Sequence, residues 1–348
     1  MPALKIFTGS THDAAPEDRT RWTLRQAFEQ VTLPRLKRRQ RAPGSVEKYK
    51  RAVWYWEQAT DDPAIGRITA DDLDEFVELL AEPGRWALRT ATAANQQLGY
   101  VEAILRSCGP RIGRNGGAGI LTEVPAGERL PTEAPTKRRR LVPLEHLDAI
   151  YRACRVATWP RVHGLPAPLL WRVAFVLAYN VGPRRCELFK MPASADRPQA
   201  AYPGDADDIE ATSPHGWLAF PTPKTARRKQ QLPLVVPVNL TTRQHLDAIR
   251  TGTRRLRLLP MGDHASTWRR HSFRIQTAAG IGEPYTWQDL RKTASRAYRR
   301  TAGRDVAEFI LGHKPRGTNA TFYDDLTADA VAAVERLPQP AAFLEGVA

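Results

Sequence analysis

Short motifs of basic and hydrogen-bonding residues follow one another through the C-terminal part of the chain. The first is Gly182-Pro183-Arg184-Arg185-Cys186-Glu187-Leu188, which comes shortly after an apolar segment. If a helix restarts there, its free backbone N–H groups and the Arg184 guanidinium would face an anion. Further motifs follow in chain order: Pro223-Lys224-Thr225, Gln288-Asp289-Leu290-Arg291, Leu311-Gly312-His313 and Thr321-Phe322-Tyr323. The first motif predicts an anion site, and the side chains of the others are the candidates to act on that anion.

The charge of the chain indicates which kind of anion to expect. There are 52 Lys and Arg against 37 Asp and Glu, a formal net charge of +15. Residues 1–136 hold 19 basic and 18 acidic residues, whereas residues 137–348 hold 33 and 19, so the second part carries a net +14. A globular region this basic favours a polyanionic partner, and the planar guanidinium suits phosphate oxygens. A generally arginine-rich proteome is the alternative explanation. A membrane surface is disfavoured, because the basic residues do not gather on one amphipathic helix.

Several common catalytic and targeting patterns are absent from the sequence. It has no G-x-x-x-x-G-K-[ST], no G-x-S-x-G, no H-E-x-x-H and no tight carboxylate cluster. Three separated cysteines, Cys108, Cys154 and Cys186, argue against a zinc site and a disulfide framework. We therefore predict no metal and no cofactor. With neither a spanning apolar run nor a signal pattern, the expected location is the cytoplasm, in association with the nucleoid.

Apolar periodicity predicts helices in the N-terminal part. Residues 1–20 are polar and are expected to form a flexible tail. Residues 21–110 contain amphipathic segments expected to form a small four-helix bundle, over about 23–40, from about 45, from Thr69 and over about 88–108. Thr69 is the expected N-cap of the third helix, with Asp72 three residues later.

The remainder is expected to be a linker followed by a larger domain. Residues 111–140 are rich in Gly, Pro and polar residues and are predicted to be the linker. Residues 141–348 form the second domain, mostly helical with a small antiparallel sheet. Its expected helices span about 144–156, 167–179, 242–250, 287–301 and 304–311, and its strands 217–220 and 232–238. Pro233 and Pro237 predict that the second strand lies at an edge.

In their order and spacing the motifs resemble the catalytic signature of the tyrosine recombinase, or phage integrase, family. That signature has an Arg in a G-x-R-x-x-E-L context, a hairpin Lys, an H-x-x-R, an L-G-H and a Tyr about ten residues later. Five of its six residues fall in order here, as Arg184, Lys224, Arg291, His313 and Tyr323. The resemblance covers nearly the whole chain. It implies a mainly α protein, with a four-helix (SAM-like) core-binding domain before the linker and a mixed, mostly helical catalytic domain after it.

The sixth position departs from the signature. Gln288 stands where the family usually has the His of H-x-x-R. A glutamine side chain donates and accepts hydrogen bonds but cannot take up a proton near neutral pH. The general-base contribution attributed to this position is therefore missing from the predicted site.

The resemblance implies site-specific cleavage and rejoining of DNA without metal or ATP, through a 3′-phosphotyrosine intermediate. Arg184 and Arg291 would hold the non-bridging phosphate oxygens, and Tyr323 would be the covalent nucleophile. Lys224 would protonate the leaving 5′ oxygen, and His313 would hydrogen-bond the phosphate. Glu187, one turn after Arg184, would orient it.

The implied partners are a double-stranded recombination site and, on DNA, three further copies of the chain in a homo-tetramer. Free in solution the chain would be a monomer or weak oligomer. The candidate DNA-binding residues lie in basic runs: Arg35, Lys37, Arg38, Arg39, Arg41, Lys137, Arg138, Arg139, Arg140, Arg227 and Arg228. The run 137–140 is equally well explained as a solvated charge run. A helical stripe after Tyr323 ends in a tail that would pack either on its own domain or on a neighbour.

Two other functions fit the same residues. One is a DNA-binding protein of this fold with weak or no strand exchange, which Gln288 favours. The other is a type IB topoisomerase-like enzyme, which relaxes DNA by the same chemistry. The intact Arg184, Lys224, Arg291, His313 and Tyr323 argue against the first, and the additional helical domain argues against the second.

Overall fold

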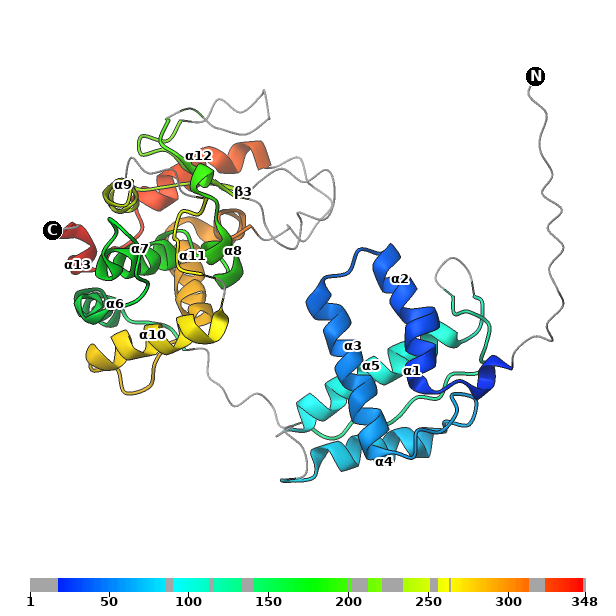
Figure 1. The fold of residues 1–348 in the computed structure, drawn as a ribbon. Coiled ribbons are helices and arrows are strands. Elements are labelled where there is room, and N and C mark those ends of the chain that lie inside the picture. The colour runs from blue at the N-terminus through cyan, green and yellow to red at the C-terminus, as the bar shows by residue number, and fades with distance from the viewer. Residues whose placement is uncertain are drawn as a thin grey trace, which may run out of the picture. The chain divides into compact units, whose positions relative to one another are not determined.

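The computed structural model of the protein folds into two compact units, Met1–Thr136 and Lys137–Ala348 (Figure 1). It describes residues 18–84, 90–112, 116–132, 140–199, 201, 212–220, 234–250, 256–262, 264–312 and 323–346, without the side chains of residues 323–325. The predicted tail 1–20 falls mostly outside these ranges. Among the described helices, none is long and apolar enough to cross a membrane.

Unit 1 is a helical bundle. Its helices are α1 (Leu24–Ala27), which continues through a π-helical turn (Phe28–Thr32) into α2 (Leu33–Arg38), then α3 (Pro43–Ala59), α4 (Ala70–Ala81) and α5 (Ala91–Cys108). The expected apolar faces are buried in one core, where the rings of Trp56 and Phe76 lie 5.1 Å apart. The predicted second helix begins earlier than expected, because Pro43 occupies its first turn, where a missing N–H costs nothing.

The start of α4 follows the sequence prediction. The Thr69 hydroxyl accepts a hydrogen bond from the Asp72 N–H, and the Asp72 carboxylate accepts one from the Thr69 N–H at 2.7 Å. These reciprocal bonds satisfy two N–H groups that a helix start leaves free. Local sequence therefore fixes this helix boundary.

The segment 116–132, which we expected to be linker, packs on the helices of unit 1. Leu121 is buried in its core, and the Arg129 guanidinium donates a hydrogen bond to the buried carboxylate of Glu102. The Asn95 side-chain amide donates to the Leu130 carbonyl and accepts from its N–H. The Gly- and Pro-rich composition indicated irregular backbone correctly, but these long-range contacts attach that backbone to the bundle.

Unit 2 is built around two long helices, α7 (Ala167–Asn180) and α11 (Trp287–Ile310), which pack on each other. Figure 1 shows α6 (Leu144–Ala153) and α10 (Ala265–Ala278) on one side of this pair, with α9 (Leu240–Ala248) and α12 (Tyr323–Glu335) on the other. Most of α7 is buried on all sides, as its continuous apolar sequence predicts. The short helices α8 (Arg185–Lys190) and α13 (Ala341–Leu344) complete the unit.

A small antiparallel sheet lies beside these helices. Its strands are β1 (Asp196–Arg197), β2 (Trp217–Phe220) and β3 (Leu234–Pro237), in that order, with Leu218 opposite Val236. Within the described residues β3 is an edge strand, as its prolines predicted. The predicted mainly helical fold with a small antiparallel sheet is confirmed.

Two helices of unit 2, α10 and α11, differ from the sequence prediction. The helix α10 was not predicted, because its buried face alternates Trp268 and Ile275 with the polar residues Ser272 and Gln276. In α11 the break expected near Gly303 is a kink, where Gly303 has φ 88° inside a continuous helical segment. The left-handed backbone that this φ requires is readily adopted by glycine.

The C-terminal segment packs on its own unit. Phe343 is fully buried, and its ring lies 5.1 Å from that of Tyr151 on α6. The Ala342 N–H donates a hydrogen bond to the Asp148 carboxylate, and Arg152 forms a salt bridge with Glu345. In the single chain the tail therefore packs on its own domain, and packing on a neighbouring protomer stays a prediction.

Candidate active site

Arg184 lies at the turn that joins α7 to α8. It is the N-cap of α8, and its backbone N–H donates to the Glu187 carboxylate at 2.6 Å. Its guanidinium donates to the other Glu187 oxygen at 2.7 Å. Glu187 is buried, whereas the Arg184 side chain is 27% exposed. Glu187 therefore holds both the backbone and the side chain of Arg184, while leaving part of the guanidinium open to an anion.

Arg291, in the second turn of α11, is held more tightly. Its side chain is 6% exposed and donates hydrogen bonds to the carbonyl oxygens of Gly182 and Leu311. It also approaches the Glu187 carboxylate, at 3.9 Å. One guanidinium thus joins the turn that precedes α8 to the end of α11.

The buried carboxylate of Glu187 lies between two guanidinium groups. Burial, followed by repulsion from Arg184, lowers the pKa of Arg291 to about 10, and attraction by Glu187 acts in the opposite direction. This pKa is still well above neutral pH, so Arg291 stays protonated there. The three side chains carry a net charge of about +1, which leaves the group complementary to an anion.

A glycine allows this approach of backbone and side chains. Gly182 has φ +60°, and a Cβ there would lie 2.6 Å from a methyl carbon of Leu311 and 3.2 Å from the Cβ of Ala294. A side chain at this position would have to displace the Leu311 methyl group and would press on the Cβ of Ala294. The glycine that opens the first motif is therefore favoured by its left-handed backbone conformation and by these close contacts.

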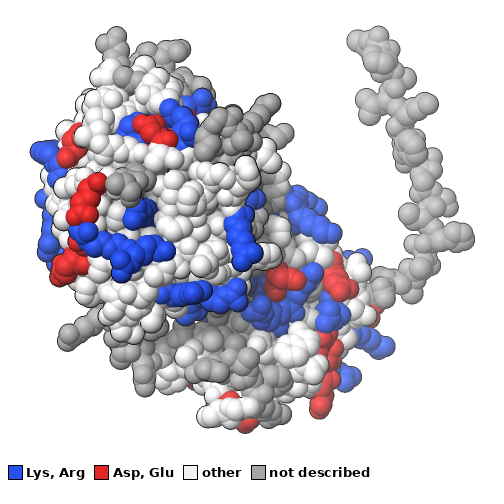
Figure 2. Space-filling model, turned by 60° about the vertical axis from the view of Figure 1, so that its left-hand side comes forward, with Lys and Arg blue, Asp and Glu red and all other residues white. Residues whose placement is uncertain are grey.

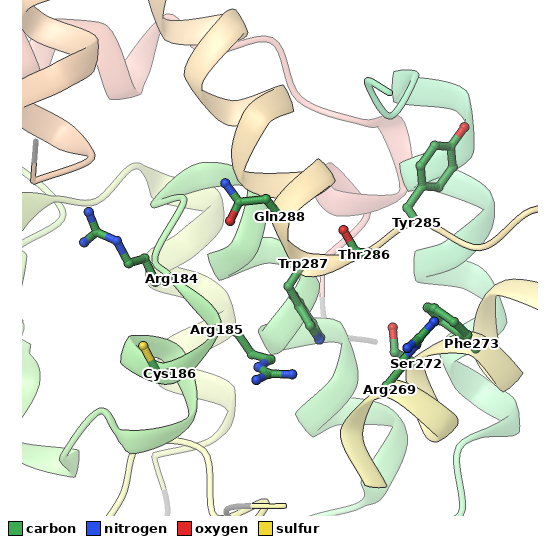
Figure 3. A pocket seen from close by; sticks show the side chains of 10 residues that line it. All are labelled: Arg184, Arg185, Cys186, Arg269, Ser272, Phe273, Tyr285, Thr286, Trp287 and Gln288. Atoms are coloured by element: carbon green, nitrogen blue, oxygen red, sulfur yellow. The ribbon is translucent and has the colours of Figure 1, made fainter. Parts of the chain in front are cut away.

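Gln288 is exposed in the first turn of α11 and stands between two hollows. The first hollow, of about 470 Å³, lies between the starts of α8 and α11 and the helix α10 (Figure 3). The second, of about 360 Å³, lies along α11 and is lined by Arg291, Lys292 and Arg296 among others. In Figure 3 the Gln288 amide is directed to the side on which Arg184 lies. Arg184, Gln288 and Arg291 are thus brought together around one small region.

The remaining predicted catalytic residues lie outside the described residues. These are Lys224, His313 and the side chain of Tyr323, whose backbone begins α12. Gly312, directly before His313, has φ +61°, and a Cβ there would lie 2.7 Å from a methyl carbon of Leu234 on β3. The chain therefore passes β3 closely just before it reaches His313.

No protein-family model and no curated protein matches the sequence. Solved structures do match. A lambda integrase tetramer bound to a Holliday junction has a TM-score of 0.58 and 18% identity, covering 89% of this chain and 83% of that chain. Lambda integrase residues 75–356 bound to DNA have a TM-score of 0.57 and 18% identity, over 88% of this chain and 96% of that one. The chain has the fold of the tyrosine recombinases.

Within this tyrosine recombinase fold, unit 1 presents part of the predicted DNA-binding run. Lys37, Arg38, Arg39 and Arg41 are exposed at and beyond the end of α2. Arg35 is half-buried and donates a hydrogen bond to the Gly116 carbonyl at 3.1 Å. Arg35 therefore has a structural contact inside unit 1, whereas the rest of the run faces solvent.

The second predicted basic run is described only at Arg140. Its guanidinium forms a salt bridge with Glu283 at 2.7 Å and lies 4.5 Å from the centre of the Tyr285 ring. These contacts attach the start of unit 2 to the loop that leads into α11. Lys137, Arg138, Arg139, Arg227 and Arg228 lie outside the described residues.

The structure also shows basic residues around the site that sequence reasoning missed. Arg185 and Arg269 line the first hollow, and Lys292, Arg296 and Arg299 line the second. Figure 2 shows clusters of Lys and Arg side chains over the face drawn there. The spacing 292, 296, 299 is that of one helical face and could have been recognised. Arg269 could not be assigned, because α10 itself was not predicted.

Proposed function

We propose that the protein is a site-specific DNA recombinase that cleaves and rejoins strands through a 3′-phosphotyrosine link. The observation that carries this proposal is the pair of guanidinium groups, Arg184 and Arg291, held about one buried carboxylate within the tyrosine recombinase fold. Such a pair offers fixed, permanently charged donors to the oxygens of one phosphate. The two comparison structures are lambda integrase bound to a Holliday junction and lambda integrase bound to DNA, which supports DNA as the substrate.

In the proposed reaction the Tyr323 phenolic oxygen attacks the scissile phosphorus. A phosphorus–oxygen bond to Tyr323 forms, and the bond to the 5′ oxygen breaks. Lys224 gives that oxygen a proton, while Arg184, Arg291 and His313 stabilise the charge on the non-bridging oxygens. The reverse attack by a 5′ hydroxyl rejoins the strand. The bond energy is kept in the phosphotyrosine, so ligation requires no ATP.

We propose that both units hold the DNA. Unit 1 would serve as the core-binding domain, contacting phosphates with the exposed Lys37, Arg38, Arg39 and Arg41, and unit 2 as the catalytic domain. Four protomers would act together, as strand exchange between two sites requires four cleavages. The tetramer on a Holliday junction among the comparison structures supports this arrangement.

The second candidate is a DNA-binding protein of the same fold with little strand exchange. Gln288 favours it, because the side chain is exposed at the site but cannot act as a base. Type IB topoisomerase-like relaxation is a third possibility by the same chemistry. A covalent adduct on a nicked duplex carrying the target site separates the second candidate from the first, and a supercoil relaxation assay beside a two-site recombination assay identifies the third.

We expect Gln288→Ala to slow cleavage and Gln288→His to keep or raise its rate. The amide can hydrogen-bond the phosphate or the tyrosine oxygen, and losing a positioned donor costs about 10²-fold. A histidine would add a titration near its reference pKa of about 6.5. Single-turnover cleavage measured against pH for wild type and both variants gives the result. Because Gln288 is exposed, unfolding temperatures should stay unchanged. Wild-type cleavage by Gln288→Ala would remove Gln288 from the mechanism.

DNA binding should weaken steeply with salt. If unit 2 and the exposed run of unit 1 neutralise roughly six or more phosphates, log K falls against log salt with a slope of about −5 or steeper. Fluorescence anisotropy with a labelled duplex between about 50 and 200 mM salt measures it. A flat response would contradict DNA as the partner altogether.

A further inference from the structure

The first hollow contains basic side chains that have no role in the proposed cleavage step. Its lining comes from the start of α8, from α10 and from the start of α11, and it has a volume of about 470 Å³ (Figure 3). Arg185 and Arg269 are its cationic members beside Arg184, and none of the described residues that line it carries a carboxylate. This volume lies within the range of pockets that bind small-molecule ligands, so it can accommodate a phosphate group.

Both arginines are exposed and available to a ligand. Across the described ranges neither Arg185 nor Arg269 forms a salt bridge, and the Arg269 guanidinium lies 5.0 Å from the centre of the Phe273 ring. The stretch from His264 to Gly282, which contains α10, carries Arg269, Arg270 and Arg274 and no acidic residue. Two exposed guanidinium groups around one hollow repel each other unless an anion lies between them.

An unpaired donor lies beside the two arginines. The Nε1–H of Trp287 is buried and has no hydrogen-bond partner in the described part of the chain. Figure 3 shows this edge of the indole on the same side as the Arg185 guanidinium. A buried N–H without an acceptor costs free energy, so an incoming oxygen at this place would be favoured.

The side chains of Arg184 and Arg185 point to different places. Their side chains diverge in Figure 3: that of Arg185 is directed toward Trp287, and that of Arg184 away from it. Two guanidinium groups that point apart cannot grip one phosphate, but they can hold successive phosphates of one strand. In duplex DNA these follow one another about every 3.4 Å along the helix axis.

We propose that this hollow binds a second phosphate of the DNA substrate, next to the scissile one, through Arg185 and Arg269. This rests on the proposed function and adds a substrate subsite to it. The second contact fixes the strand on either side of the reacting phosphorus, so that the scissile phosphate meets Arg184 and Arg291 in one orientation. Trp287, which begins α11 directly before Gln288, would close the subsite with its N–H.

The test is a double-mutant cycle in which arginine substitutions in the protein are combined with neutralised phosphates in the DNA. A duplex carrying a site selected in vitro with the wild-type chain is made with single neutral methylphosphonates across the cleavage position. Affinities are measured by anisotropy in the Tyr323→Phe background, so that no cleavage occurs. Neutralising one phosphate beside the scissile one should weaken wild-type binding about tenfold or more. For R185Q/R269Q the same neutralisation should change affinity less than about twofold, because the contact is already lost.

The matched control is R270Q/R274Q, which removes two exposed charges from α10 that do not line the hollow. It should keep the wild-type pattern of sensitive phosphates. If R185Q/R269Q retains every wild-type sensitivity, or if the control loses the same one, the subsite is wrong. Wild-type binding that ignores all methylphosphonates and salt would instead contradict the proposed function. Unfolding temperatures of both double variants should match wild type, because all four side chains are exposed.

Discussion

Tyr323→Phe should abolish covalent attachment to DNA while leaving site binding within about twofold of wild type. The substitution removes only the nucleophilic oxygen, and no other side chain in the proposed mechanism forms a bond to phosphorus. A nicked suicide substrate carrying the target site traps the adduct, which is detected by gel electrophoresis in detergent.

The control is a second tyrosine that lies away from the site. Tyr100 is partly buried on α5 of unit 1, with its ring 4.9 Å from that of Tyr49, and Tyr100→Phe should form the adduct at the wild-type rate. An adduct that persists in Tyr323→Phe would show that another residue is the nucleophile. If wild type forms no adduct although it binds the site, the DNA-binding candidate replaces the recombinase.

Arg291→Ala should reduce single-turnover cleavage at least about 10³-fold, because a buried cation that faces developing charge is lost. It should also destabilise unit 2 by about 3 kcal/mol, since Glu187 loses one of its two cationic neighbours and two buried carbonyls lose a donor. Cleavage and the unfolding temperature measured on the same preparation give both effects.

Lys292→Ala is the matched control for the effect on stability, since Lys292 also lines the second hollow. Lys292 is the next residue on α11, its side chain is 41% exposed, and its one salt bridge among the described residues is with Asp289, at 3.7 Å. We expect its unfolding temperature to stay near that of wild type. Arg291→Lys should recover part of the stability but little of the cleavage, because an ammonium cannot reach both carbonyls and a phosphate as a guanidinium can. Wild-type cleavage by Arg291→Ala would contradict the proposed site.

Local signals explain which parts of the fold could be predicted from the sequence. The N-cap at Thr69, the apolar segment of α7 and the edge strand β3 each depend on residues close together in the chain, and each prediction is confirmed. The helix α10 was not predicted, because its inward face includes the polar residues Ser272 and Gln276. These polar residues are satisfied only in the fold, where the Gln276 amide bonds the backbone of Tyr285.

The sequence indicated Arg184, Glu187, Gln288 and Arg291, which the structure brings together, but it did not indicate their geometry. The contact of Arg184 with Glu187 follows from helical spacing and was anticipated. The contacts of Arg291 with Gly182 and Leu311 join distant segments, which no spacing in the sequence reveals. The arginines of the first hollow were missed for the same reason, because they meet only when α8 and α10 pack beside α11.

The way Arg291 is held has a consequence for the evolution of such chains. Because its guanidinium ties two segments of unit 2 together, selection for a folded DNA-binding protein alone would retain it after strand exchange had been lost. Gln288 is exposed, so substitutions there should cost little folding free energy. Under the proposed function, an arginine at 291 in relatives of this chain would therefore indicate an intact fold, whereas the residue at 288 would respond mainly to selection on cleavage.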